Sequence, residues 1–170
     1  GISINHLTHN ENDIGAFRTF FKMSPPLRDE DDREAMIAAI ADGTIDIICS
    51  NHDPQDVETK RHPWAEAEDG AIGLETMLAA ALRLFHCEQV DLVTLLGAMT
   101  NKPADRLGLE TGRLAKGAPV DIAVFAPDRP WVLEKSAIRS HSKNSPFEDA
   151  RFSGRVLRTV VAGKTVFAHS

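Results

Sequence analysis

The feature that most constrains the fold is a helix pattern that leads directly into a short β-branched run. An acidic cluster at Asp29–Glu34 favours a helix start facing water, and apolar residues then recur as far as Gly43. Ile45–Cys49 follows at once, with the size and composition of a buried parallel strand. Further helix patterns cover 73–87, 91–99 and 103–107. Helices that alternate with buried strands predict a parallel α/β architecture.

Strands dominate after Gly108. The segment 121–126 alternates as a strand, and 155–161 with 164–167 predicts a hairpin across Ala162-Gly163. The order of elements predicts an α/β fold, the C-terminal part of a (β/α)8 barrel over 1–108 followed by a small β-sandwich-like domain over 109–170.

The first residues also have strand character. Two short β-like runs, 2–7 and 18–23, are predicted as strands near the start. Because the chain begins at Gly1 without Met, within a run of strand character, we expect it to be part of a longer polypeptide.

Composition and charge narrow the classes of partner. The formal net charge is -6, and 42% of residues are hydrophobic, which suits one sizeable core. An acidic chain offers no basic surface for nucleic acid or anionic membranes, and no apolar stretch approaches the roughly 20 residues of a membrane span. Cys49 and Cys87 lie outside any Cys-x-x-Cys motif and suit reduced thiols in the cytoplasm. A small molecule or another protein is the expected partner.

The segment 51–71 is predicted to be a long loop. It is polar, contains Pro and Gly, and lacks apolar periodicity, and loops longer than about 12 to 15 residues are usually functional. Lys60 and Arg61 are either solvated or available to an anionic ligand. Trp64 either anchors the loop in an apolar pocket or meets a partner. Asp53 and Asp56 are candidates for capping local turns.

Four stretches, 17–28, 45–76, 101–126 and 142–167, resemble the dihydroorotases of the long, barrel-plus-β-domain class within the amidohydrolase superfamily. The most specific element is Ser50–Pro54 followed by Gly70–Thr76. The Pro-Pro-Leu-Arg run at 25–28 and the segment 142–147 support the resemblance in the same order.

The resemblance implies a zinc-dependent barrel enzyme of pyrimidine biosynthesis. Such an enzyme hydrolyses the cyclic amide of dihydroorotate reversibly to carbamoyl aspartate, and a carboxylate transfers the proton from water to the leaving nitrogen. The family's metal ligands are expected upstream of Gly1. Zinc is therefore expected in the full-length protein, and we expect residues 1–170 to hold no metal alone.

The resemblance also assigns the site residue by residue. Asn51 stands at the family's catalytic aspartate position, where an amide cannot act as a base. Asp53 is the candidate substitute base. The substrate-binding positions are occupied by Ser24, Gln55, Asp69 and Gly70, and only Gly70 keeps the family's residue. His52 is expected to be packed or water-bound without a metal role, and the other six histidines to be at the surface or structural.

Three functions remain open. The first is an active dihydroorotase that uses Asp53. The second is a catalytically silent homologue that stabilises aspartate transcarbamoylase, as the family resemblance implies, and the losses at Ser24, Asn51, Gln55 and Asp69 favour it. The third is an amidohydrolase for another cyclic amide. In each case we expect the remainder of the barrel to pack against these residues, and an oligomer.

Overall fold

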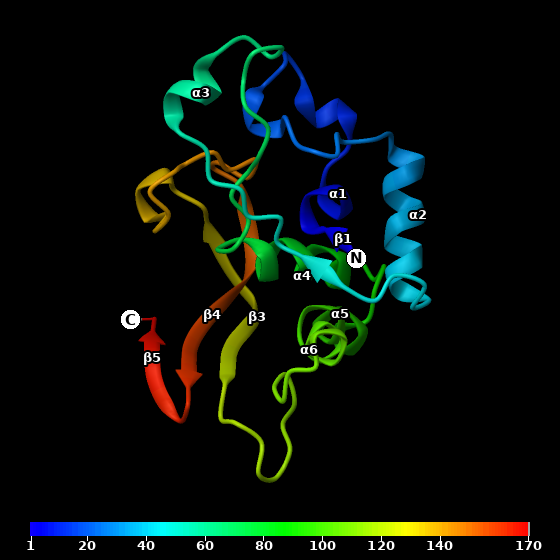
Figure 1. The fold of residues 1–170 in the computed structure, drawn as a ribbon, viewed down its shortest axis with the longest axis vertical. Helices are drawn as coiled ribbons and strands as arrows, with labels where there is room; N and C mark the ends of the chain where they lie inside the picture. Colours follow the sequence, from blue (N-terminus) through cyan, green and yellow to red (C-terminus); the bar gives the residue numbers. More distant parts are fainter. Residues whose placement is uncertain (170) are drawn as a thin grey trace.

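The computed structural model describes residues 1–169 and shows a mixed α/β chain (Figure 1). A parallel pair of short strands lies among helices, and an antiparallel sheet follows at the C-terminal side. The elements are β1 (Ile2–Ser3), α1 (Ile4–Thr8), α2 (Glu30–Ala41), β2 (Ile48–Cys49), α3 (Val57–Arg61), α4 (Met77–His86), α5 (Leu92–Met99), α6 (Asn101–Leu107), β3 (Ile122–Val132), β4 (Arg151–Val161) and β5 (Lys164–Ala168), with 3-10 helices at Glu11–Ile14, Thr19–Phe21 and Lys135–Ala137.

The strands β1 and β2 are parallel neighbours connected through α2. Ile2 lies opposite Ile48, and the Ile2 amide donates to the Ile47 carbonyl oxygen at 2.8 Å. The helix expected after Asp29 is confirmed, because the Asp29 side chain accepts from the Asp32 amide and caps α2. A helix that returns the chain to a parallel neighbouring strand is the repeating unit of an α/β barrel.

Two predicted strands near the start are wrong over most of their length. The run 2–7 is strand only at Ile2–Ser3, because the Ser3 hydroxyl accepts from the Asn5 amide at 3.2 Å and starts α1. The run 18–23 instead contains the 3-10 helix Thr19–Phe21. Apolar composition over a few residues does not separate a strand from a short helix.

The predicted loop at 51–71 contains one short helix. Asp56 caps α3 by accepting from the Glu58 amide at 2.8 Å, as the expected turn-capping role requires. The rest of the segment is irregular, and it crosses the molecule beside the 3-10 helix Thr19–Phe21.

The C-terminal strands form one antiparallel sheet in the order β3-β4-β5. The hairpin across Ala162-Gly163 is confirmed, with Val161 opposite Lys164. The strand β3 extends to Val132, beyond the predicted 121–126, and pairs with β4 through two register shifts. Within residues 1–169 this region contributes a single sheet of three strands.

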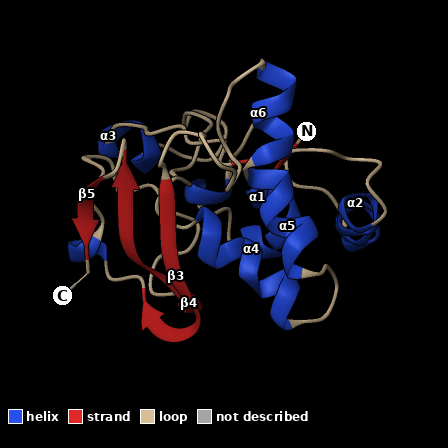
Figure 2. Cartoon of the chain, turned by 90° about the horizontal axis from the view of Figure 1, so that it is seen from below, coloured by secondary structure: helices blue, strands red, loops and turns tan. Residues whose placement is uncertain are grey.

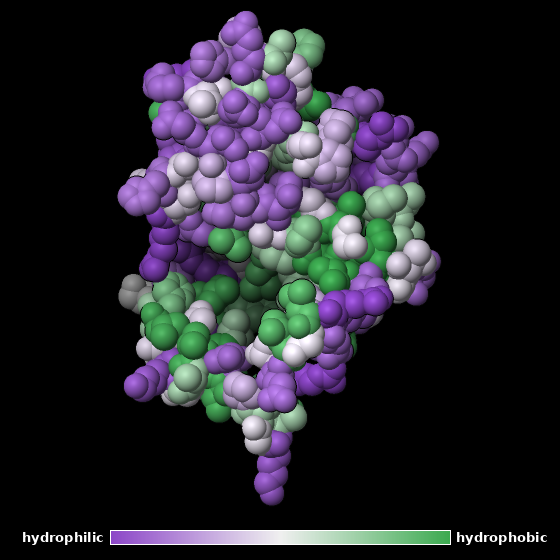
Figure 3. All heavy atoms as spheres, viewed as in Figure 1, coloured by the Kyte–Doolittle hydropathy of each residue, from purple (hydrophilic) through white to green (hydrophobic). Residues whose placement is uncertain are grey.

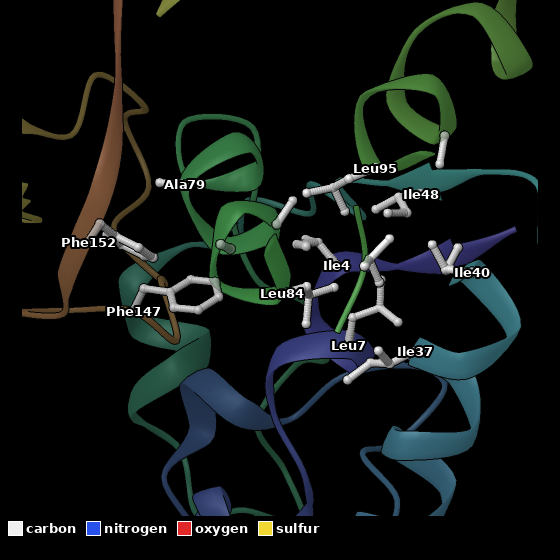
Figure 4. Close-up of a cluster of buried hydrophobic side chains, with 14 of the residues drawn as sticks. Ile4, Leu7, Ile37, Ile40, Ile48, Ala79, Leu84, Leu95, Phe147 and Phe152 are labelled. Atoms are coloured by element: carbon white, nitrogen blue, oxygen red, sulfur yellow. The ribbon is translucent and has the colours of Figure 1, made fainter. Parts of the chain in front are cut away.

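One hydrophobic core joins the helices to the sheet. Ile4, Leu7 and Leu95 are fully buried in it, and Phe147 and Phe152 enter it from the sheet side (Figure 4). The helix α4 lies between the sheet and the other helices (Figure 2), and it contacts α1, α5 and β4. The core is therefore continuous across the predicted boundary at 108/109.

Figure 3 shows hydrophilic residues over the α3 end of the molecule, and hydrophobic residues around a hollow beside the sheet and α5. A hollow of about 440 Å³ between α4 and the sheet is lined in part by Leu78, Trp131, Val156 and Phe167. Among residues 1–169 no helix has the length and apolar character that a membrane crossing requires.

Candidate functional site

The candidate site begins where β2 ends. Asn51 lies two residues beyond β2, with a φ of 45°, a left-handed conformation that asparagine tolerates. Its side chain is half-buried. Parallel strands present their C-terminal ends at the same edge, which is where barrel enzymes carry their chemistry. The amide of Asn51 offers a neutral donor and acceptor at this edge and no proton acceptor of useful strength.

His52 joins the two elements that carry the resemblance. It forms a parallel bridge with Ala71, and its Nδ1 accepts from the backbone amides of Gly73 and Leu74 at 3.2 and 3.3 Å. Because the His52 Nδ1 accepts these two hydrogen bonds, it holds the 70–74 segment in place. The expectation that His52 is a packed, structural histidine is consistent with this geometry.

Asp53 lies directly over Gly70. A Cβ at position 70 would come within 2.5 Å of the Asp53 Oδ2, and Gly70 has a φ of 119°, so a side chain there would both displace the Asp53 carboxylate and strain the backbone. The Asp53 Oδ1 accepts from Gln55 Nε2 at 2.8 Å. The structure thus brings together Asp53, Gln55 and Gly70, and the Asp53 carboxylate is exposed.

Asn144 organises the same region, although the sequence analysis assigns it no individual role beyond its place in the segment 142–147. Its side chain is 2% exposed, and its Nδ2 donates to the carbonyl oxygens of Asp53 at 3.0 Å and Gly70 at 3.2 Å. Its Oδ1 accepts from the Gln55 amide at 3.3 Å. The signal available in the sequence was an asparagine inside a matched motif, because such a side chain needs hydrogen-bond partners wherever the fold buries it. Through Asn144 the connection between β3 and β4 reaches the candidate site.

The two other predicted substrate-binding positions lie at a hollow that is separate from the one between α4 and the sheet. Ser24 and Asp69 both line a cavity of about 270 Å³, together with Lys22 and Trp64. The Lys22 Nζ lies 3.7 Å from the Asp69 Oδ1 and donates to the Ala67 carbonyl oxygen at 2.6 Å. Asp69 therefore faces a cation of its own chain. Trp64 packs edge-on against Phe17, with ring centroids 5.9 Å apart.

Lys60 is buried, so the expectation of a solvated side chain is wrong for it. Its side chain is 4% exposed, and its Nζ donates to the carbonyl oxygens of Glu68, Thr19 and Lys22 at 2.6, 3.0 and 3.4 Å. Burial lowers the pKa of the Lys60 ammonium to about 8, although the carboxylates of Asp69 and Asp53 oppose that shift. Arg61 is exposed and pairs with Glu58.

The C-terminal end of β1 carries buried polar groups. Asn5 is fully buried, and neither polar atom of its side chain has a hydrogen-bond partner within residues 1–169. His6 and His9 are also buried, and each has one ring nitrogen without a partner in the same set of residues. Burial lowers the pKa of His9 to about 4, against the raising effect of the Asp13 carboxylate. The expectation of structural histidines suits this packed arrangement.

The zinc that the resemblance implies does not fit the residues present. Across residues 1–169 no three His, Cys, Asp or Glu side chains lie close enough together to hold a metal ion. The side chains nearest the ends of β1 and β2 include the amides of Asn5 and Asn51, which are poor replacements for imidazole or carboxylate ligands. A zinc ion in a longer protein would need ligands from elsewhere in that protein.

The comparisons with known proteins agree with the fold and the motifs. The model of the amidohydrolase family matches residues 12–166. The chain is 40% identical over 166 residues to a dihydroorotase of Anaplasma phagocytophilum, and 41% identical over 166 residues to one of Ehrlichia chaffeensis. Each match covers 98% of this chain and 37% of the relative, so the chain spans little more than a third of either.

A solved structure shows the same arrangement of elements. The L-hydantoinase (dihydropyrimidinase) from Arthrobacter aurescens superposes with a TM-score of 0.92 at 28% sequence identity, over 98% of this chain and 38% of that one. The predicted fold class, part of an amidohydrolase barrel with an adjoining β region, is confirmed. The chain belongs to the amidohydrolase family, as a dihydroorotase-like member.

Proposed function

We propose that the longer protein of which this chain forms part binds dihydroorotate or a similar cyclic amide and opens its ring by hydrolysis, in pyrimidine biosynthesis. The observation that carries the proposal is the parallel bridge between His52 and Ala71, with the hydrogen bond from the Asp53 amide to the Ala71 carbonyl oxygen at 2.8 Å. It places the two elements of the family motif side by side, as a shared ligand pocket requires. Relatives named dihydroorotase and L-hydantoinase support the cyclic-amide class.

Asp53 is the carboxylate that this proposal uses as the base. Gln55 donates to one of its oxygens and orients the group, while the exposed position leaves the carboxylate open to a water molecule. In hydrolysis the water adds to the ring carbonyl carbon, the carbon–nitrogen bond breaks, and the nitrogen receives the proton that the base removed from water. Asn51 orients the ligand carbonyl through its amide in this scheme and transfers no proton.

A second candidate is a non-catalytic partner that stabilises aspartate transcarbamoylase. The amide at Asn51 favours it, because the amide at this strand end cannot replace an aspartate base. Asp69 also favours it, because a carboxylate paired with Lys22 stands where the family has an aromatic residue. In this role the protein keeps the architecture of the pocket and works through its surface. A third candidate is hydrolysis of a different cyclic amide, which the likeness to L-hydantoinase supports.

The test is an assay of the full-length protein for cyclisation of carbamoyl aspartate with zinc present. The proposal expects turnover that falls at least a hundredfold in Asp53→Ala and persists in the control Asp56→Ala, which removes only the cap of α3. Absence of turnover in the wild-type protein, together with co-purification of a transcarbamoylase, would replace hydrolysis with the partner role. Turnover of a hydantoin but not of dihydroorotate would select the third candidate.

We further propose that the rest of a barrel packs against β1 and β2, and that the protein works in the cytoplasm as an oligomer. The parallel pair β1-β2 supports such packing, because among residues 1–169 neither strand has a partner on its outer edge.

A further inference from the structure

Lys60 is the one buried lysine within residues 1–169, and the proposed reaction does not use it. Isolated ammonium groups are expensive to bury, and replacing a buried ionic group by an apolar one is often neutral or stabilising. Stability alone therefore does not explain its presence. Its Nζ instead donates to three backbone carbonyl oxygens, a number that matches its three donor hydrogens.

The three carbonyl groups come from two separate segments. Thr19 and Lys22 belong to the segment that leads to Ser24, and Glu68 precedes Asp69 and Gly70. One further bond joins the same segments, because the Gly70 amide donates to the Lys22 carbonyl oxygen at 2.9 Å. Another holds Lys60 to the first segment, because the Thr19 hydroxyl donates to the Lys60 carbonyl oxygen at 2.5 Å. The buried ammonium group of Lys60 is thus hydrogen-bonded to both segments and links them.

The hollow of about 270 Å³ lies beside the segments that Lys60 joins, and its lining comes mostly from residues 14–27, with Trp64 and Asp69. Lys22 and Ser24 line it from one of the joined segments, and Asp69 from the other. Asp69 also adjoins Gly70, against which the Asp53 carboxylate packs, so a shift of the 68–70 segment would move Asp53 as well. Ligand sites need this kind of fixed geometry, because small displacements weaken binding and reaction.

We propose that Lys60 is a positioning residue that fixes the spacing between Ser24 and the Asp69–Gly70 turn, and through Gly70 the position of the Asp53 carboxylate in the site that receives the cyclic amide. The inference rests on the proposed function for the identity of the ligand. The link that Lys60 makes between the two segments, called the clamp below, rests only on the contacts of Lys60.

The experiment compares Lys60→Met with Arg61→Met in the full-length protein. Lys60→Met keeps the length of the side chain and removes its donors, whereas Arg61 is exposed and its ion pair lies at the surface. The first measurement is amide hydrogen exchange, which does not depend on activity. We expect the Gly70 amide to exchange at least tenfold faster in Lys60→Met, with no change at Ala80–Leu84 in α4 and none in Arg61→Met.

The second measurement is the dissociation constant of dihydroorotate, by calorimetry. We expect Lys60→Met to weaken binding at least fivefold and Arg61→Met to leave it unchanged. If the wild-type protein does not bind dihydroorotate, the proposed ligand is wrong, and hydrogen exchange alone decides whether the clamp exists. An unchanged Gly70 exchange rate, or an equal increase at α4, would overturn the inference, as would unchanged affinity in a protein that binds.

A milder variant covers the case in which Lys60→Met does not fold. Thr19→Val removes the hydroxyl that donates to the Lys60 carbonyl oxygen and keeps the shape of the side chain. We expect the Gly70 amide to exchange faster and dihydroorotate to bind more weakly than in the wild-type protein. On a logarithmic scale, each change should be about half of that stated for Lys60→Met. No change in either measurement would contradict the clamp.

Discussion

The side-chain amide of Asn144 donates a hydrogen bond of 3.2 Å to the carbonyl oxygen of Gly70, across 74 positions of the sequence. The bond connects the segment between two strands of the C-terminal sheet to the glycine of the candidate site. The sheet region is thereby part of the structure that shapes this site.

Asn144→Ala is expected to destabilise the full-length protein by about 2–3 kcal/mol, because the buried carbonyl groups of Asp53 and Gly70 lose their donor. Asn144→Asp removes the same donor and places a carboxylate against both carbonyl oxygens, so its effect should be at least as large. Denaturant unfolding measures both. Ser142→Ala, a half-buried neighbour, is the control, and equal losses in the three variants would refute the role of Asn144.

Gly70→Ala tests the close approach of Asp53. Both Gly70 and Gly43 have positive φ, but a Cβ at Gly43 meets nothing within 4 Å, whereas one at Gly70 meets the Asp53 carboxylate. Gly43→Ala should therefore cost about 1 kcal/mol from backbone strain, and Gly70→Ala about 2–3 kcal/mol, with displacement of Asp53. Equal unfolding free energies for the two variants would show that Asp53 moves aside freely.

The stability of the protein should fall as the pH falls from about 6.5 to 4, because burial lowers the pKa of His9 from 6.5 to about 4. In this interval the unfolded chain binds a proton that the folded protein excludes. His9 lies between Phe21 and Phe147, with ring centroids 5.1 and 4.6 Å away. His9→Phe should remove on the order of 1–2 kcal/mol of this pH dependence, measured by denaturant unfolding. The exposed His62→Gln should keep it, and a slope unaffected by His9→Phe would contradict the assignment.

Unfolding of the barrel part and the sheet should coincide, because they share one hydrophobic core. Trp64 and Trp131 are the two tryptophans, one on each side of the predicted boundary, so single-tryptophan variants of the longer protein report the two regions separately. Phe152→Ala should lower both midpoints together, at about 3–4 kcal/mol. Val166→Ala, which removes most of an exposed side chain, should leave both unfolding midpoints unchanged. Two separate transitions would show that the sheet folds independently.

The sequence alone predicted the elements whose signals are local. The helix after Asp29 has a capping residue and an acidic first turn, and the hairpin across Ala162-Gly163 has a turn signal between alternating strands. The motif elements at 50–54 and 70–76 also identified the family, which the comparisons confirm. These features depend on residues close together in the chain.

Tertiary structure alone decided the rest. Short apolar runs became strand or 3-10 helix according to their neighbours, as at Thr19–Phe21. The sequence placed Lys60 in a polar loop, yet the carbonyl group of Glu68 in that loop and the distant carbonyl groups of Thr19 and Lys22 bind its ammonium and let it be buried. Asn144 likewise acquires its role from Asp53, Gln55 and Gly70, about 74 to 91 positions away. The physical reason is that the burial and hydrogen bonding of a polar side chain depend on which backbone groups the fold brings to it, and these contacts are not encoded in local periodicity.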